Sequence, residues 1–146
     1  MCLIALAWQV HPRYPLIVVA NRDEFFERPT DPAHWWPDHS SLFAGRDLEG
    51  GGTWLGVTRE GRFAALTNFR DPTRNSPDRR SRGELVVNAL TADDEQSWLG
   101  RLEATAAAYN PFNLLAGNLD QLFVFESTTL KLRPVPPGIQ GLSNHL

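Results

Sequence analysis

The chain has 146 residues, of which 42% are hydrophobic and 21% are charged, and its formal net charge at pH 7 is -3. A chain of this length can bury a hydrophobic core, so the sequence predicts one domain over residues 1–146. The charge balance excludes a general attraction to nucleic acid or to an anionic membrane, and we expect neither as a partner. One cysteine excludes an intrachain disulfide, and no 18-residue apolar run or signal-peptide pattern occurs, which indicates a cytoplasmic setting.

The start of the chain predicts a hairpin that ends in a polar cluster. An apolar run without polar alternation begins at Cys2, which is typical of a strand buried on both faces, and a second apolar run begins at Leu16. In an antiparallel pair, the start of the first strand lies beside the end of the second. If Trp8 lies opposite Leu16, Cys2 falls opposite Arg22, within about two residues. The thiol and the polar side chains of residues 21–24 should therefore meet at one end of a sheet.

Residues 25–52 predict a long ordered connection that covers this sheet end. The segment holds three prolines, the pair Trp35 and Trp36, and three consecutive glycines. The tryptophans argue against disorder, because disordered segments are poor in aromatic residues. The glycines lack the Gly-Lys-Ser/Thr ending of a phosphate-binding loop, so a bend leading into a strand is favoured.

A second hairpin is predicted over residues 53–57 and 62–68. Gly61 suits the left-handed position of a type I turn followed by a bulge. The second strand ends at Asn68, which becomes a candidate amide donor at a sheet edge.

The arginine-rich segment 70–82 is balanced by acidic residues and lacks stacking aromatics, which favours a solvated loop over a phosphate or RNA patch. Ser81-Arg82-Gly83-Glu84 matches a capping box, so a short helix is expected over 82–90. A second helix is expected over 91–108, with apolar residues at helical spacing. Both helices should cover one sheet face.

Three strands are expected after Pro111, over residues 112–116, 121–126 and 129–133. A further extended run covers 139–144 and is cut off at the end of the sequence. This pattern predicts an N-terminal portion of a longer domain.

Cys2 is a candidate nucleophile because of its position. Removal of Met1 would leave a free α-amino group beside the thiol, and an α-amine with a pKa of about 7.7 to 8.0 can serve as its base. Asp23 could hold the ammonium form, Arg22 could favour the thiolate or bind a substrate carboxylate, and Asn68 could donate to an oxyanion. The alternative interpretation is that Cys2 is a small buried apolar residue.

Several ordered motifs carry a resemblance to a known family. They are Met1-Cys2-Leu3-Ile4, Ala20-Asn21-Arg22-Asp23-Glu24-Phe25, Ala44-Gly45-Arg46-Asp47, Gly51-Gly52-Thr53-Trp54-Leu55-Gly56, Ala65-Leu66-Thr67-Asn68-Phe69-Arg70 and Gly141-Leu142-Ser143-Asn144. Together they resemble the NRDE family, also called the transport and Golgi organisation 2-like family, through nearly the whole chain.

The resemblance implies an α+β fold like that of the N-terminal nucleophile (Ntn) hydrolases, a four-layer αββα sandwich of antiparallel sheets, incomplete here at the C-terminus. A weaker similarity reaches the choloylglycine hydrolase and penicillin acylase group, whose members cleave linear amides with an N-terminal cysteine. By this resemblance Cys2 matches the nucleophile, and Asn68 and Asn144 match two active-site asparagines. Arg22 and Asp23 fall where that group has an arginine and an aspartate, at a different spacing. The group's last catalytic arginine would lie beyond the final residue.

Two functional hypotheses follow. The first is an Ntn-type amidohydrolase that acts on a small-molecule amide through Cys2. The second is a non-catalytic binding or trafficking protein that uses the same pocket for a hydrophobic ligand, haem or an acyl lipid. The residues expected to contact the substrate or ligand are Asn21, Trp35, Trp36 and Trp54. His34 and His39 could suggest haem ligation, but isolated histidines are more often surface residues. No metal-ligand spacing occurs, so no metal or required cofactor is expected.

Overall fold

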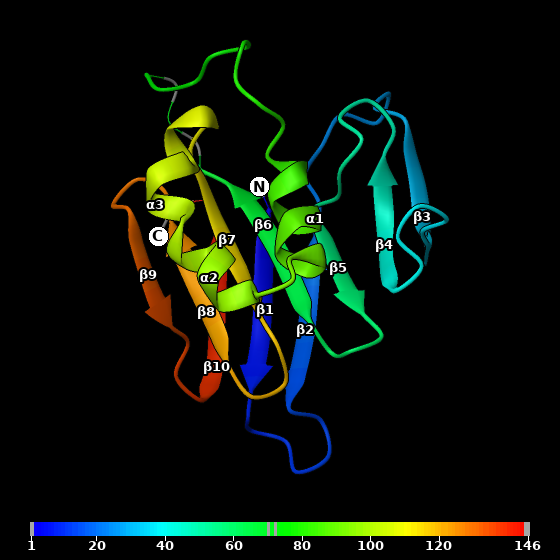
Figure 1. The fold of residues 1–146 in the computed structure, drawn as a ribbon, viewed down its shortest axis with the longest axis vertical. Helices are drawn as coiled ribbons and strands as arrows, with labels where there is room; N and C mark the ends of the chain where they lie inside the picture. Colours follow the sequence, from blue (N-terminus) through cyan, green and yellow to red (C-terminus); the bar gives the residue numbers. More distant parts are fainter. Residues whose placement is uncertain (1, 70, 72, 145–146) are drawn as a thin grey trace.

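The computed structural model describes residues 2–69, 71 and 73–144, which form two antiparallel sheets with helices over one side (Figure 1). The small sheet has the order β10-β1-β2, and the large sheet runs in sequence order from β3 to β9. The strands of the small sheet are β1 (Leu3–Trp8), β2 (Leu16–Asn21) and β10 (Gly138–Ser143). Those of the large sheet are β3 (Thr30–Trp35), β4 (Leu42–Asp47), β5 (Leu55–Thr58), β6 (Phe63–Asn68), β7 (Phe112–Gly117), β8 (Leu122–Glu126) and β9 (Lys131–Pro134).

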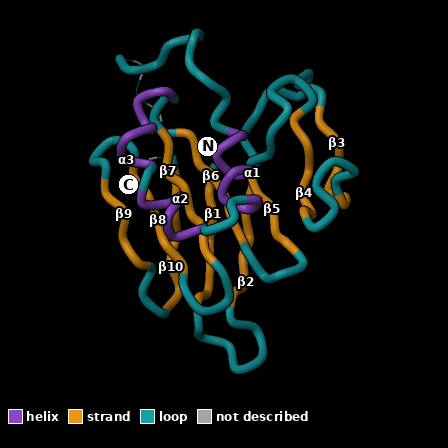
Figure 2. The backbone as a smooth tube through the Cα atoms, viewed as in Figure 1, coloured by secondary structure: helices purple, strands orange, loops and turns teal. Residues whose placement is uncertain are grey.

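The helices lie between β6 and β7 in the sequence and pack on the face of the large sheet that points away from the small sheet (Figure 2). They are α1 (Gly83–Thr91), α2 (Glu95–Gly100), α3 (Leu102–Thr105) and a 3₁₀ turn over Ala106–Ala108. One apolar cluster joins these helices to the large sheet, and a second joins the two sheets. The α+β class and the antiparallel sandwich are as expected, and the described residues supply one helix layer and both sheet layers.

The strand β1 is buried on one face only, so the expectation of a strand buried on both faces was wrong. Ile4, Leu6 and Trp8 point toward the large sheet and are 2 to 4% exposed, whereas Leu3 on the other face is 43% exposed. Alternation is set by the pleat, which sends successive side chains to opposite faces. Within the described part of the chain, no helix covers the outer face of the small sheet.

The expected connection over residues 25–52 contains two strands, β3 and β4. Proline is tolerated in β3 because this strand forms the edge of the large sheet, and the register shifts between Asp31 and His34, on either side of Pro32. The last part is a tight turn, in which the N–H groups of Asp47 and Gly51 bond to the carbonyls of Gly52 and Asp47. The prediction of a bend before the next strand therefore holds, and the two strands within the connection were not predicted.

The second hairpin has the expected turn, since Gly61 has a φ of 84°. The first helix begins one residue later than predicted, and the capping box is not formed, because no side chain caps α1. The carboxylate of Glu84, which would complete the box, is held by Arg80 at 2.6 Å.

The predicted second helix is divided into α2, α3 and the 3₁₀ turn. It begins at Glu95, where the carboxylate of Asp94 accepts hydrogen bonds from the N–H groups of Gln96 and Ser97. Leu102 and Ala106 still face the core, which is why their helical spacing indicated the correct buried face.

Candidate active site

The hairpin of β1 and β2 brings Cys2 to the NRDE segment. The register pairs Trp8 with Leu16 and Leu3 with Asn21, so the expected pairing is confirmed. The side-chain oxygen of Asn21 accepts the N–H of Leu3 at 3.0 Å. Just beyond this pair, the N–H of Asp23 donates to the sulfur of Cys2 at 3.4 Å.

A polar pocket of about 440 Å³ opens at this sheet end. Its wall includes four of the predicted catalytic residues, Cys2, Arg22, Asp23 and Asn68. Cys2 is partly exposed, as a nucleophile must be to meet a substrate. The pocket therefore gathers the residue before β1, the residues after β2 and the end of β6.

Asn144 lies behind Asn68 and does not belong to the pocket wall. It is 3% exposed, and its side-chain nitrogen donates to the backbone carbonyl of Asn68 at 2.6 Å. The hydroxyl of Thr67 and the amide of Asn113 both donate to the carbonyl of Ser143, at 3.0 and 3.3 Å. These bonds tie the end of β10 to the end of β6, and Asn144 contacts Asn68 from outside the pocket wall.

An ion cluster around Asp47 fixes Arg22. The Asp47 carboxylate binds Arg28 at 2.8 Å and Arg22 at 3.3 Å, and it accepts the N–H groups of Glu49 and Gly50 at 3.1 Å each. Burial alone would raise the pKa of Asp47, but these backbone bonds and the Arg28 guanidinium outweigh it and lower the pKa. Asp47 closes the motif Ala44-Gly45-Arg46-Asp47, which could have marked it as a site residue.

Three arginines that were not predicted as site residues complete the wall. Arg79, Arg80 and Arg82 line the polar pocket, although their segment was expected to be a solvated loop. Arg82 is largely buried; burial lowers its pKa, while the nearby Glu24 and Cys2 act in the opposite direction. No local signal indicates this placement, because it depends on how α1 docks against the end of the large sheet.

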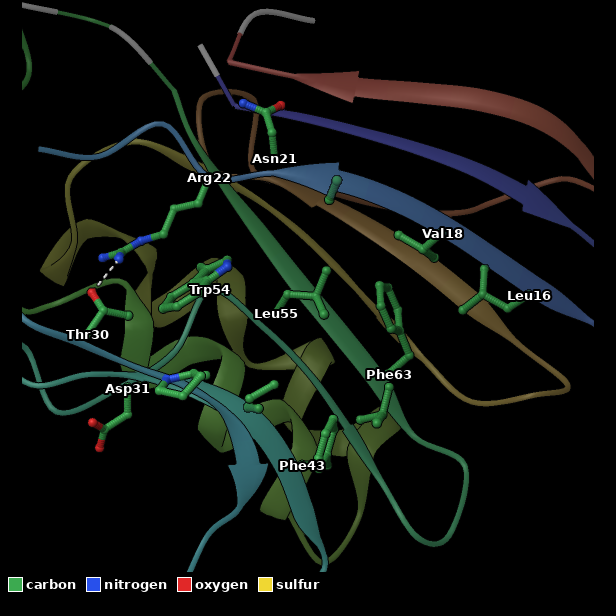
Figure 3. A pocket seen from close by; sticks show the side chains of 16 residues that line it. Leu16, Val18, Asn21, Arg22, Thr30, Asp31, Phe43, Trp54, Leu55 and Phe63 are labelled. Atoms are coloured by element: carbon green, nitrogen blue, oxygen red, sulfur yellow. Dashed lines mark hydrogen bonds between the residues drawn. The ribbon is translucent and has the colours of Figure 1, made fainter. Parts of the chain in front are cut away.

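A second, apolar cavity of about 820 Å³ lies between β2 and the β3–β6 part of the large sheet (Figure 3). Leu16 and Val18 of β2 face Phe43, Leu55 and Phe63 across it. The remaining lining residues include Asn21, Arg22 and Trp54, as well as Thr30 and Asp31.

Arg22 and Trp54 stand where the two spaces meet, since both line each of them. The guanidinium of Arg22 lies 4.1 Å from the centre of the Trp54 ring and donates to the hydroxyl of Thr30 at 2.8 Å. A cation over an indole is a favourable stacked arrangement. The polar pocket and the apolar cavity are therefore neighbouring compartments that share this pair as a boundary.

Of the tryptophans expected to contact a ligand, only Trp54 lines these compartments. Trp36 is 2% exposed in the core, where its indole N–H donates to the carbonyl of Ala44 at 3.1 Å. Trp35 packs against Phe43 and stacks under Arg59. The prediction that Trp35 and Trp36 form apolar pocket walls is therefore not met by their placement.

The haem suggestion finds no support. His34 and His39 line neither compartment, and the ring of His34 is 2.8 Å from the carbonyl oxygen of Pro32. Among residues 2–69, 71 and 73–144 no group of three or more His, Cys, Asp or Glu side chains could hold a metal ion. The same part of the chain has no helix that is long and apolar enough to cross a bilayer.

A comparison with solved structures identifies the fold class. The Caenorhabditis elegans ortholog of N-acylethanolamine-hydrolyzing acid amidase superposes with a TM-score of 0.61 over 99% of this chain and 70% of that chain, at 9% sequence identity. The fold is thus that of the Ntn hydrolases.

Sequence comparison then identifies the family. Residues 1–146 match the family described as Transport and Golgi organisation 2. The mouse Transport and Golgi organization 2 homolog is 39% identical over 160 residues, and the Drosophila melanogaster protein is 32% identical over 157. The chain spans 58% and 55% of the lengths of these two relatives. The protein belongs to the Transport and Golgi organisation 2 family.

Proposed function

We propose that the protein is an N-terminal-nucleophile-type hydrolase that cleaves a linear amide (C–N) bond through Cys2. The observation that supports this most directly is the position of the Cys2 sulfur, which accepts the Asp23 N–H at 3.4 Å in a pocket shared with Arg22 and Asn68. The Ntn-hydrolase fold provides the framework in which such a residue acts.

The reaction follows from the chemistry of an N-terminal cysteine. After removal of Met1, the α-amine of Cys2 takes the thiol proton, and the sulfur attacks the amide carbonyl. Asn68 donates to the resulting oxyanion. The C–N bond then breaks as the ammonium of Cys2 returns its proton to the leaving amine. Water, deprotonated by the same amine, hydrolyses the thioester and restores the thiol.

The surrounding residues have positioning roles in this scheme. Asp23 favours the ammonium form of the Cys2 amine, and Arg22 is held near the thiol by Asp47. Asn144 orients Asn68 through its bond to the Asn68 carbonyl. The acyl part of the substrate occupies the apolar cavity beyond Trp54. The volume of this cavity, about 820 Å³, lies within the usual range for small-molecule sites.

The test is amide hydrolysis by protein whose N-terminus has been checked by intact mass. A panel of N-acyl amides with short and long acyl chains is assayed with the wild type, Cys2→Ala and Asn68→Ala. We expect Cys2→Ala to lose at least about a thousandfold in kcat/KM and Asn68→Ala about a hundredfold or more. Turnover that is unchanged in Cys2→Ala would refute the proposal.

A second candidate is a non-catalytic carrier of an acyl lipid, and the large apolar cavity favours it. In a carrier the ligand would bind through that cavity alone. Tight uptake of a fatty acid that survives Cys2→Ala but is lost in Val18→Asp, together with no hydrolysis of any amide, would support the carrier over the hydrolase.

A further inference from the structure

Two arginines of the polar pocket are held by neutral backbone groups. The guanidinium of Arg82 donates to the carbonyl of Pro111 at 3.0 Å, and that of Arg79 donates to the carbonyl of Tyr109 at 2.6 Å. Among the described residues, neither has an ion pair with a carboxylate within 4.0 Å, whereas Arg22 and Arg28 both bind Asp47. Carbonyl bonds orient a guanidinium without cancelling its charge.

The position of Arg82 is fixed by the packing of α1. Arg82 directly precedes the helix, whose first residue, Gly83, abuts the Gly52–Thr53 segment. The N–H of Thr53 donates to the carbonyl of Gly83 at 3.3 Å, and a Cβ atom on Gly52 would lie 2.4 Å from the carbonyl carbon of Gly83. Such close backbone contact holds the start of α1 against the sheet end, so Arg82 is in place before any ligand binds.

Arg82 also shares its pocket with the thiol and is partly desolvated. It lines the same pocket as Cys2, and the two groups interact electrostatically. A guanidinium that is largely removed from water and bound to neutral carbonyls is well suited to a second, anionic partner, which it can bind through two parallel hydrogen bonds. Glu24 reaches Arg82 electrostatically, but Glu24 is itself within 4.0 Å of both Arg22 and Arg28.

We propose that Arg82 and Arg79 form an anion-binding subsite that takes a carboxylate on the amine side of the amide substrate. The inference rests on the proposed function and makes it more specific, because the substrates are then N-acyl amino acids. The acyl chain lies in the apolar cavity, the amide carbonyl lies at Cys2, and the carboxylate of the leaving amino acid meets the two arginines.

The experiment measures binding, so it does not depend on turnover. Calorimetry with the Cys2→Ala protein compares a long-chain N-acylglycine with the corresponding N-acylglycinamide, which has nearly the same size and no charge. We expect the carboxylate to bind about tenfold more tightly or better, with a preference that falls as salt rises. Arg82→Gln and Arg79→Gln should each reduce the ratio of the two affinities toward one and leave the affinity for the glycinamide unchanged.

Two further variants separate charge from structure. Arg82→Lys keeps the charge and should keep part of the preference. Arg74→Gln removes an arginine of the same loop that pairs with Asp71 at 3.3 Å and lies outside the polar pocket. This variant should change the affinity for neither ligand. If Arg82→Gln fails to fold, the exposed Arg79 still provides the test.

Several results would overturn the subsite. They are equal affinity for the two ligands, an Arg79→Gln variant with an unchanged preference, or an equal loss of preference in Arg74→Gln. Hydrolysis of amides without any preference for the carboxylate would overturn the subsite and leave the hydrolase proposal intact. A preference for the carboxylate without any hydrolysis would overturn the hydrolase proposal and leave the anion-binding subsite intact.

Discussion

Asp47 is the residue through which the acidic and basic groups of the site are joined. Asp47→Asn removes the charge that binds Arg22 and Arg28 and should lower the free energy of unfolding at pH 7 by about 2 kcal/mol. The folded-state pKa of Asp47 is lowered, so its contribution is fully present above its unfolded pKa of about 3.9. The contribution is lost as pH falls through the lower, folded-state pKa.

Urea unfolding of the wild type and Asp47→Asn between pH 7 and pH 3 measures this contribution. The difference between the two proteins should be largest at neutral pH and shrink at the acidic end. Asp78→Asn, at an exposed residue of the arginine-rich loop, is the control and should follow the wild type. A difference for Asp47→Asn that stays constant with pH would contradict the assigned role of the carboxylate.

The sequence alone located those site residues that share a hairpin or a strand end. Cys2 and Arg22 were brought together by counting positions across the turn, and Asn68 was recognised as the end of a strand. Arg82 was missed because its place depends on contacts with residues about thirty positions away in sequence, such as Pro111. Trp36 was misplaced because an aromatic residue looks the same in sequence whether it fills a core or a pocket.

Among the elements, α1 is docked through two glycines, and this contact can be tested directly. An added Cβ on Gly52 would meet the Gly83 carbonyl at 2.4 to 2.6 Å, and backbone atoms cannot give way cheaply. Gly52→Ala should therefore lower the free energy of unfolding by about 2 kcal/mol or more and displace Arg82 from the pocket. The measurement is urea unfolding at neutral pH.

Gly100→Ala is the matched control, because a Cβ on Gly100 at the end of α2 meets nothing within 4 Å. Its effect on stability should be within about 1 kcal/mol and in the stabilising direction. Equal stability of the two alanine variants would show that α1 does not rest on Gly52 as described.

The order of the helices and strands was largely predictable from the sequence, whereas the edge strand β3 and the start of α1 were less so. Hairpins with a clear turn residue such as Gly61 were predicted correctly, because the alternation of apolar and polar residues and the chemistry of a turn are local properties of the sequence. β3 was missed because Pro32 is allowed only where a strand lies at an edge, and edge position is a property of the whole sheet. The capping box failed because Arg80 competes for Glu84.

For the whole molecule, the apolar side chains of the small sheet divide between a buried and an exposed face. Leu6 is 4% exposed between the sheets, and Ile139 is 80% exposed on the outer face. Leu6→Ala should cost about 2 to 4 kcal/mol of unfolding free energy, and Ile139→Ala less than about 1 kcal/mol. Urea unfolding checks both, and similar losses for the two variants would contradict the two-sheet packing.

In the proposed mechanism, the thiol of Cys2 works with its own α-amine. Intact mass of protein purified from cells, before and after exposure to a cysteine-directed electrophile, tests it, because Cys2 is the only cysteine. We predict that Met1 is absent, and that Cys2 reacts faster at neutral pH than free cysteine does. A variant that carries extra residues before Cys2 should lose this advantage. Retained Met1, or a Cys2 no more reactive than free cysteine, would contradict the account.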